Sequence, residues 1–114
     1  MKYKFEKIDW DNTTIYSVKS ENEILDHFGS WNWTPEKIQE IIDGVEKSRN
    51  AKPENEYIWS NEDVYFKSLK YGVFFVDLLA KRAGEKFKKQ ALDLQHDEFL
   101  TFLKDFKKFV EQNV

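Results

Sequence analysis

The chain contains no cysteine among its 114 residues. Disulfide bonds, thiolate nucleophiles and thiolate metal ligands are therefore excluded. No apolar run approaches the roughly 20 residues that span a bilayer, and the opening MKYKFEKIDW has no apolar segment typical of a signal peptide. We accordingly expect a cytoplasmic protein without a signal peptide or membrane anchor.

Glycine and proline are also scarce, with four and two residues, whereas phenylalanine, tyrosine and tryptophan number ten, five and four. The scattered glycines form neither GxxxxGK[ST] nor GxGxxG, so a backbone cradle for phosphates is not expected. An aromatic-rich chain of this length can bury about two-thirds of its unfolded surface. We predict one folded domain over residues 1–114 and no cofactor.

Charge is unevenly distributed along the chain. Residues 1–63 carry fourteen acidic and eight basic side chains, a net −6, whereas residues 64–114 carry seven and ten, a net +3. An acidic surface repels nucleic acid and attracts a basic partner. The first half is therefore the place to look for a surface that binds a basic protein.

The first half begins with strand signals. Residues 2–19 alternate apolar and charged side chains around a turn-forming segment at 10–13, which predicts an antiparallel hairpin. Residues 21–28 fit either a helical turn or a third short strand.

The segment GSWNWTP predicts the start of a helix over 35–48. Thr34 is a suitable N-cap and Pro35 fits the first helical position. Trp33 and Ile38 then occupy the two positions of a hydrophobic staple, which makes Trp33 structural, while Trp31 either packs with it or stays partly exposed at the rim. An apolar stripe completes the pattern, formed by Ile38, Ile41, Ile42 and Val45.

Three strands in a meander are predicted over 56–60, 64–70 and 72–80, the last of them central and covered on both faces. The basic stretch over 81–90 fits a loop, a strand extension or a polar helical turn, and a loop is favoured. A short strand over 90–94 and a helix over 96–112 follow. The helix has a core stripe widened by two further aromatics: Phe99, Leu103, Phe106 and Val110, with Phe102 and Phe109. The predicted fold is α+β, a largely antiparallel sheet packed with two helices.

Catalytic chemistry has little support in the residues. His27 and His96 are the two histidines. His27 lies beside acidic residues and is either a candidate general base or a partly exposed histidine, while His96 is expected to cap the last helix or lie at the surface. We predict that the chain is not an enzyme and has no catalytic residues.

A metal site and a nucleic-acid site are the two other kinds of site on which the residues bear. Asp9 with Asp11, and Glu21 with Glu23, have the i, i+2 spacing of residues on one face of a strand, but no histidine joins them, and we predict no metal site. The basic stretch Lys81–Lys89 contains Phe87, which suits either RNA binding or a solvated loop anchored by that ring.

Acidic residues interleaved with aromatics offer the best candidate surface. Carboxylates can occupy the place of substrate phosphates on a basic partner, and aromatic rings anchor interfaces. The alternative is ordinary solubilising charge. The candidate partner-binding residues are Asp9, Asp11, Glu21, Glu23, Asp26, Trp31, Glu54, Glu56, Tyr57, Trp59, Glu62 and Asp63.

Two longer patterns resemble known families. EYIWSNEDVYF followed by LDLQHDEFLTFLKDFKKFV resembles small bacterial immunity proteins of contact-dependent growth inhibition and other polymorphic toxin systems. ENEILDHF, WTPEKIQEIIDGVEKS and EFLTFLKDFKKFVEQ resemble corresponding parts of the YacL family of small bacterial proteins.

The first resemblance implies a cytoplasmic antidote that binds a toxin domain and masks its active site or substrate surface. The acidic half of the chain would suit a basic toxin such as a nuclease. Two alternatives remain open: a small enzyme or ligand-binding protein that uses His27 with nearby carboxylates, and RNA binding through Lys81–Lys89.

Overall fold

The computed structural model describes residues 1–29, 31–49, 56–84 and 91–113, and it confirms an α+β fold. The described elements, in chain order, are β1 (Tyr3–Trp10), β2 (Thr13–Ser20), α1 (Glu23–Asp26), the 3-10 turn η1 (His27–Gly29), α2 (Pro35–Ser48), β3 (Tyr57–Ser60), β4 (Val64–Leu69), β5 (Gly72–Asp77), α3 (Leu78–Arg82), β6 (Ala91–Leu94) and α4 (His96–Asn113).

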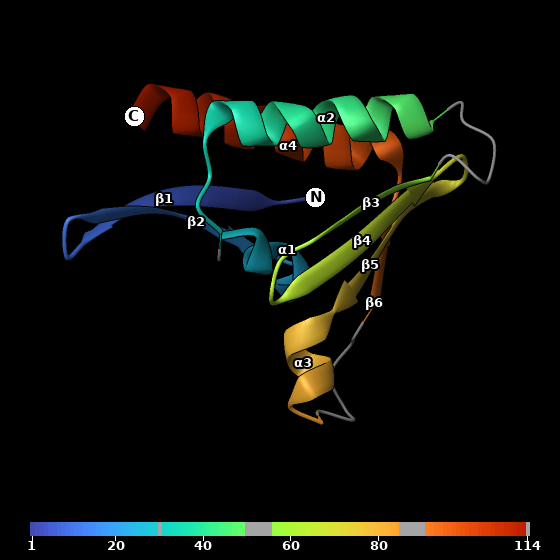
Figure 1. Ribbon diagram of the computed structural model, residues 1–114, viewed down its shortest axis with the longest axis horizontal. Coiled ribbons are helices and arrows are strands. Elements are labelled where there is room, and N and C mark those ends of the chain that lie inside the picture. Colours follow the sequence, from blue (N-terminus) through green and yellow to red (C-terminus); the bar gives the residue numbers. More distant parts are fainter. Residues whose placement is uncertain (30, 50–55, 85–90, 114) are drawn as a thin grey trace.

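The strands form two separate antiparallel sheets. The hairpin β1–β2 is one, and the other has the order β3-β4-β5-β6. The long helices α2 and α4 lie together over both sheets, with the hairpin projecting to one side and α3 extending from the far end of β5 (Figure 1). The helices therefore cover one face of the four-stranded sheet.

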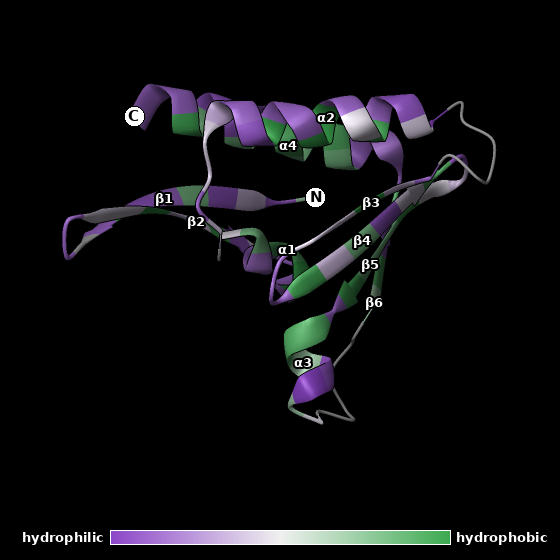
Figure 2. Cartoon of the chain, in the orientation of Figure 1, coloured by the Kyte–Doolittle hydropathy of each residue, from purple (hydrophilic) through white to green (hydrophobic). Residues whose placement is uncertain are grey.

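Helix α2 begins as the sequence predicts. The Thr34 side chain accepts a hydrogen bond from the backbone N–H of Lys37 at 3.2 Å, and Pro35 occupies the first helical position. Trp33 and Ile38, the predicted staple positions, are both buried. Hydrophilic residues form the outward side of α2, and its hydrophobic residues lie toward α4 and the strands (Figure 2).

Helix α4 extends one residue beyond the predicted 96–112. Its whole predicted stripe is buried, as is Phe102, whereas Phe109 is partly exposed. The hairpin packs on this helix through aromatic rings. Tyr3 meets Phe102 edge to face at 5.2 Å, and Phe5 lies 5.1 Å from Phe106 between ring centroids.

The prediction of one strand over 72–80 is wrong. Strand β5 ends at Asp77, whose Oδ1 accepts a hydrogen bond from the backbone N–H of Ala80 at 2.8 Å and so caps α3. The strand is central, as predicted, because it pairs with both β4 and β6. Its predicted coverage on both faces is also wrong, since Phe74 is 37% exposed.

Two other segments are resolved by the structure. Residues 23–29 are helical, as α1 and η1, so the described chain has four α-helices where two were expected. The short strand after the basic stretch is present as β6, within one residue of its predicted start. Of the predicted loop over 81–90, Lys81 and Arg82 belong to α3, and residues 85–90 lie outside the described residues.

Candidate functional site

A stack of aromatic rings joins the two sheets behind the candidate surface. Trp59 lies nearly parallel to Phe28, at 5.3 Å between ring centroids and 8° between ring planes, and it stacks on Trp33 at 5.5 Å. The indole N–H of Trp33 donates to the carbonyl of Phe28. Trp59, a predicted partner-binding residue, is therefore largely an extension of the core.

Trp31 stands on the outside of this stack. Its ring meets Trp59 edge to face at 6.1 Å and is 41% exposed, whereas Trp33 is 4% exposed. The ammonium of Lys37 lies 5.8 Å from the Trp31 ring centroid and donates to the carbonyl of Asn32 at 2.7 Å. Trp31 is thus an exposed ring that the fold holds in place.

A hollow of about 620 Å³ lies beside Trp31, along the outer edge of β2. Within the described chain β2 pairs with β1 alone, so this edge has no neighbouring strand. Gly29 lets η1 lie close against β2, because a Cβ at this position would lie 3.1–3.2 Å from the backbone of residues 16–18. The lining is mixed polar and apolar: Thr13, Thr14, Ile15, Gly29, Trp31 and Asn32.

The hairpin tip places two carboxylates next to this hollow. Asp11 and Asn12 have φ angles of 51° and 63°, the left-handed conformation that two-residue hairpin turns require. Asp9 accepts a hydrogen bond at 2.9 Å from the hydroxyl of Thr14, which lines the hollow. We call Asp9, Asp11, Thr13, Thr14, Ile15, Trp31 and Asn32 the tip surface.

The structure gives several predicted partner-binding carboxylates a role within the fold. Asp26 accepts hydrogen bonds from the backbone N–H and hydroxyl of Ser20, at 2.7 and 3.0 Å, and burial raises the pKa of this carboxyl. Asp63 pairs with Arg82 at 3.2 Å. These two side chains link elements of the chain to one another.

The remaining predicted residues are dispersed. Glu56 pairs with Lys67 at 3.5 Å, and Tyr57 is partly buried beside Gly44 of α2. Glu62 is exposed next to Asp63, Glu23 is exposed in α1, and Glu54 lies outside the described residues. The structure brings Trp31 together with Trp59 and Asp9 with Asp11, but it does not gather the twelve residues on one face.

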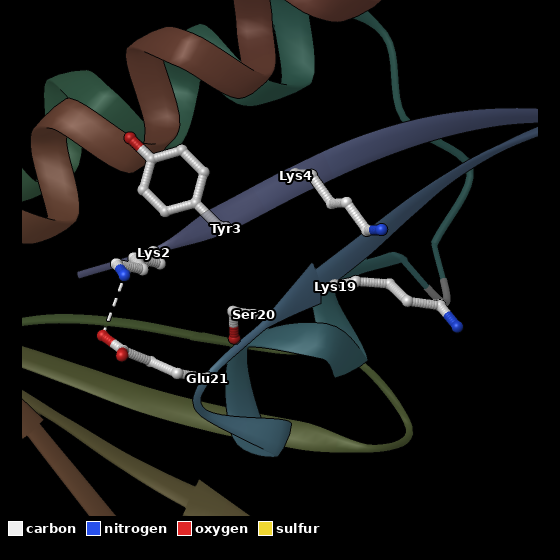
Figure 3. Close-up of a pocket in the computed structure, with 6 residues that line it drawn as sticks. All are labelled: Lys2, Tyr3, Lys4, Lys19, Ser20 and Glu21. Atoms are coloured by element: carbon white, nitrogen blue, oxygen red, sulfur yellow. Dashed lines mark hydrogen bonds between the residues drawn. The ribbon is translucent and has the colours of Figure 1, made fainter.

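Glu21 belongs to a second, basic hollow of about 340 Å³ at the base of the hairpin (Figure 3). Its carboxylate accepts a hydrogen bond from the backbone N–H of Lys2 at 3.1 Å. Lys4 and Lys19 are cross-strand partners beside it. The base of the hairpin is therefore positively charged, and the carboxylates available to a basic partner lie at its tip.

The candidate base His27 has a carboxylate partner. Its Nε2 lies 3.0 Å from Oδ2 of Asp77, whose other oxygen caps α3, and its backbone carbonyl accepts from the side chain of Asn61 at 3.1 Å. Within the described chain, His27 makes no hydrogen bond to a hydroxyl group that could act as a nucleophile. This pair connects η1 to the end of β5, and it lacks the third member of a catalytic set.

His96 also has a structural contact, because its ring N–H donates to the carbonyl of Leu69 and so ties the start of α4 to the end of β4. The residues described contain no group of three histidines or acids able to hold a metal ion. Of the basic stretch proposed for RNA, Lys81 and Arg82 are exposed on α3, and residues 85–90, with Phe87, lie outside the described residues.

The structure also contains an acidic groove that was not predicted from the sequence. It runs between α2 and α4, with Glu36, Glu40, Asp43 and Glu111 around Lys107. In the sequence, the spacing of Glu40 and Asp43 indicates only the outward face of a helix. Glu111 lies beside them because α4 packs against α2, which the sequence does not show.

Comparisons with known proteins indicate no function for this chain, so a functional proposal depends on the geometry of the site. No protein-family model, curated protein or solved structure matches this chain. In the described residues, no helix combines the length and the apolar character needed to cross a membrane.

Proposed function

We propose that the chain is a cytoplasmic immunity protein, which binds a basic toxin domain of nuclease type and masks its active site or substrate surface. The observation that carries the proposal is the exposed ring of Trp31, fixed against Trp59 beside an unpaired strand edge. Exposed tryptophans held in place are typical anchors of protein interfaces.

The tip surface fits a protein partner better than a small ligand. An unpaired strand edge offers backbone donors and acceptors to an extended segment of another chain. Asp9 and Asp11 are exposed at the tip end of the hairpin, where their carboxylates can approach lysine and arginine side chains that would otherwise bind phosphates. An aromatic anchor with acidic neighbours thus complements a basic, phosphate-binding surface.

The test is direct binding between the purified chain and the product of the gene immediately upstream of its own, which the proposal expects to contain the toxin domain. Trp31→Ala should weaken binding by about 30-fold or more, as truncation of a central aromatic anchor does. The matched control is Tyr71→Ala. Tyr71 is 81% exposed in the β4–β5 turn, at the opposite end of the molecule from the hairpin tip (Figure 1), and its removal should change affinity by less than about threefold.

Growth protection in cells that express the toxin provides the functional measurement. Trp31→Ala should lose protection while its thermal unfolding stays close to that of the unmodified chain. If no toxin-like partner binds, or if Trp31→Ala and Tyr71→Ala bind equally well, the proposal fails.

A further inference from the structure

The outer face of the four-stranded sheet carries exposed apolar side chains, and no helix of the described residues packs on it. Ile58 and Phe74 are 48% and 37% exposed, and Tyr65, Leu69 and Val76 are partly exposed on the same face. The described helices α2 and α4 pack on the opposite face, as the ribbon shows (Figure 1). An antiparallel sheet with one face in water normally carries polar side chains there, so this face has the character of an interface.

The strand register arranges the outer residues in two rows across β4, β5 and β6. In the first row, Phe74 pairs with Lys67 on one side and Asp93 on the other. In the second row, Val76 pairs with Tyr65 and Ala91. In both rows β5 contributes an apolar residue in the middle. In the first row β4 contributes a cation and β6 an anion, and in the second row β4 contributes a large ring and β6 a small side chain.

This pattern is complementary to itself under one symmetry operation. If two copies stack face to face about a twofold axis that runs along β5, strand β4 of each copy lies over β6 of the other. Lys67 then faces Asp93 of the second copy, and Tyr65 faces Ala91, while Phe74 meets its own equivalent. Opposite charges face each other, and a large side chain meets a small one.

A twofold axis across the strands gives the opposite result. It places β4 over β4 and β6 over β6. An axis through the first row makes Lys67 face Lys67 and Asp93 face Asp93, so like charges repel, and an axis between the two rows makes Lys67 face Tyr65 and Asp93 face Ala91, so no opposite charges meet. Charge and size therefore select the axis along β5.

We infer that this sheet face is the contact surface of a homodimer with its twofold axis along β5. The occupant is a second copy of the chain, because the sheet's own charges and side-chain sizes complement one another. About this axis β4, β5 and β6 of the two copies overlap. Three strands spaced about 4.8 Å apart give a face well below the roughly 800 Å² per partner of a stable interface, so the dimer forms at high concentration only. The tip surface lies outside this contact.

The proposal can be tested with two charge-reversal variants, Lys67→Glu and Asp93→Lys, measured by sedimentation equilibrium from about 10 µM to 1 mM. The unmodified chain should dimerise in this range. Each variant alone creates two like-charge contacts per dimer and should raise the dissociation constant by about tenfold or more. An equimolar mixture of the two variants should dimerise again. In the mixed dimer the introduced glutamate of one chain faces the introduced lysine of the other, and the unmodified Lys67 and Asp93 face each other at the second contact.

Glu56→Gln is the matched control. It removes the ion pair that Lys67 makes within its own chain at 3.5 Å and leaves the contact between copies intact. Its dissociation constant should equal that of the unmodified chain or be slightly lower. Far-ultraviolet circular dichroism confirms that each variant is folded, and Phe74→Ser gives a second disruptive variant that does not depend on charge.

Three results would overturn the proposal. The first is an unmodified chain that stays monomeric up to about 1 mM. The second is dimerisation that neither charge reversal weakens. The third is a mixture of the two variants that stays as monomeric as each variant alone, which would exclude the axis along β5. Trp31→Ala should dimerise normally, so failure of this proposal is distinguishable from failure of the toxin-binding proposal.

Discussion

The hairpin and the four-stranded sheet each have one covered and one uncovered face, and the uncovered faces differ in character. At its base the hairpin presents Lys4 opposite Lys19 and Glu6 opposite Ser17, all polar. The four-stranded sheet presents Phe74 and Ile58. A face of charged and polar side chains stays soluble and discourages pairing, whereas exposed large apolar side chains on a sheet face indicate a partner.

The hairpin itself changes character toward its tip. Ile8 is 40% exposed and pairs across the strands with Ile15, which lines the hollow beside Trp31. The polar base thus gives way to an apolar region where the candidate partner is expected to bind. In both sheets the proposed interface combines exposed apolar side chains with a few charged ones, Asp9 and Asp11 at the hairpin tip and Lys67 and Asp93 on the four-stranded sheet.

The largest expected effect separates the two covered faces. Phe66 is fully buried on the inner face of the sheet, while Phe5 on the hairpin is partly exposed. Phe66→Ala should lower the free energy of unfolding by about 3–5 kcal/mol, because it leaves a cavity that the core cannot refill. Phe5→Ala should cost about 1–3 kcal/mol. Urea unfolding measures both, and equal losses would contradict the distinction.

A smaller effect is expected where the hairpin meets the body of the molecule. Gly29→Ala places a methyl group 3.1 Å from the backbone nitrogen of Val18, so the hairpin must shift by a few tenths of an ångström. The expected loss of stability is about 1–3 kcal/mol. Hydrogen exchange should show reduced protection in β1 and β2 with β4 and β5 unchanged. A uniform loss of protection in both sheets would show that the hairpin is not a separate unit.

The hairpin tip should be less sensitive still. Asn12→Ala keeps a left-handed φ of 63° that alanine disfavours, at a cost of about 1 kcal/mol. Asn12→Gly is the control, since glycine adopts this conformation freely, and it should be neutral within about 0.5 kcal/mol. Thermal unfolding provides the comparison, and equal melting temperatures for the two variants would show that the turn relaxes without cost.

The helices and most strand positions were predictable because their signals are local. Thr34, Pro35 and the isoleucine stripe of α2 identify a helix from its own residues, and the alternation in residues 2–19 identifies a hairpin. The end of β5 was missed because Leu78 to Ala80 continue an apolar run, and only the capping contact from Asp77 shows that the strand stops.

The candidate site depended more on tertiary structure. The staple pattern correctly identified Trp33 as buried, but it left Trp31 either packed beside Trp33 or partly exposed, and the structure shows the exposed position. The sequence could not show which carboxylates are used internally, because Asp26 and Asp63 find partners through the fold. It also missed the apolar outer face, since Val73 to Val76 suggested burial on both sides. That face is visible only when the positions of α2 and α4 are known.

The smallest effect at neutral pH concerns the link between the hairpin and α4. The Tyr3 hydroxyl donates to the carboxylate of Asp105, and burial, together with this contact, raises the pKa of the Tyr3 hydroxyl. A raised pKa in the folded state means that this contribution is full below about pH 10, the ordinary tyrosine value, and is lost as the pH rises above it.

Tyr3→Phe should therefore cost at most about 1 kcal/mol at pH 8, the net value of one hydrogen bond, and the cost should shrink at pH 11. Urea midpoints at the two pH values give the comparison. Tyr71→Phe is the control for the loss of a tyrosine hydroxyl outside this contact, because Tyr71 is 81% exposed in the β4–β5 turn. If Tyr3→Phe behaves like this control, the hairpin is held to α4 by ring packing alone, and the hydroxyl contact has no part in it.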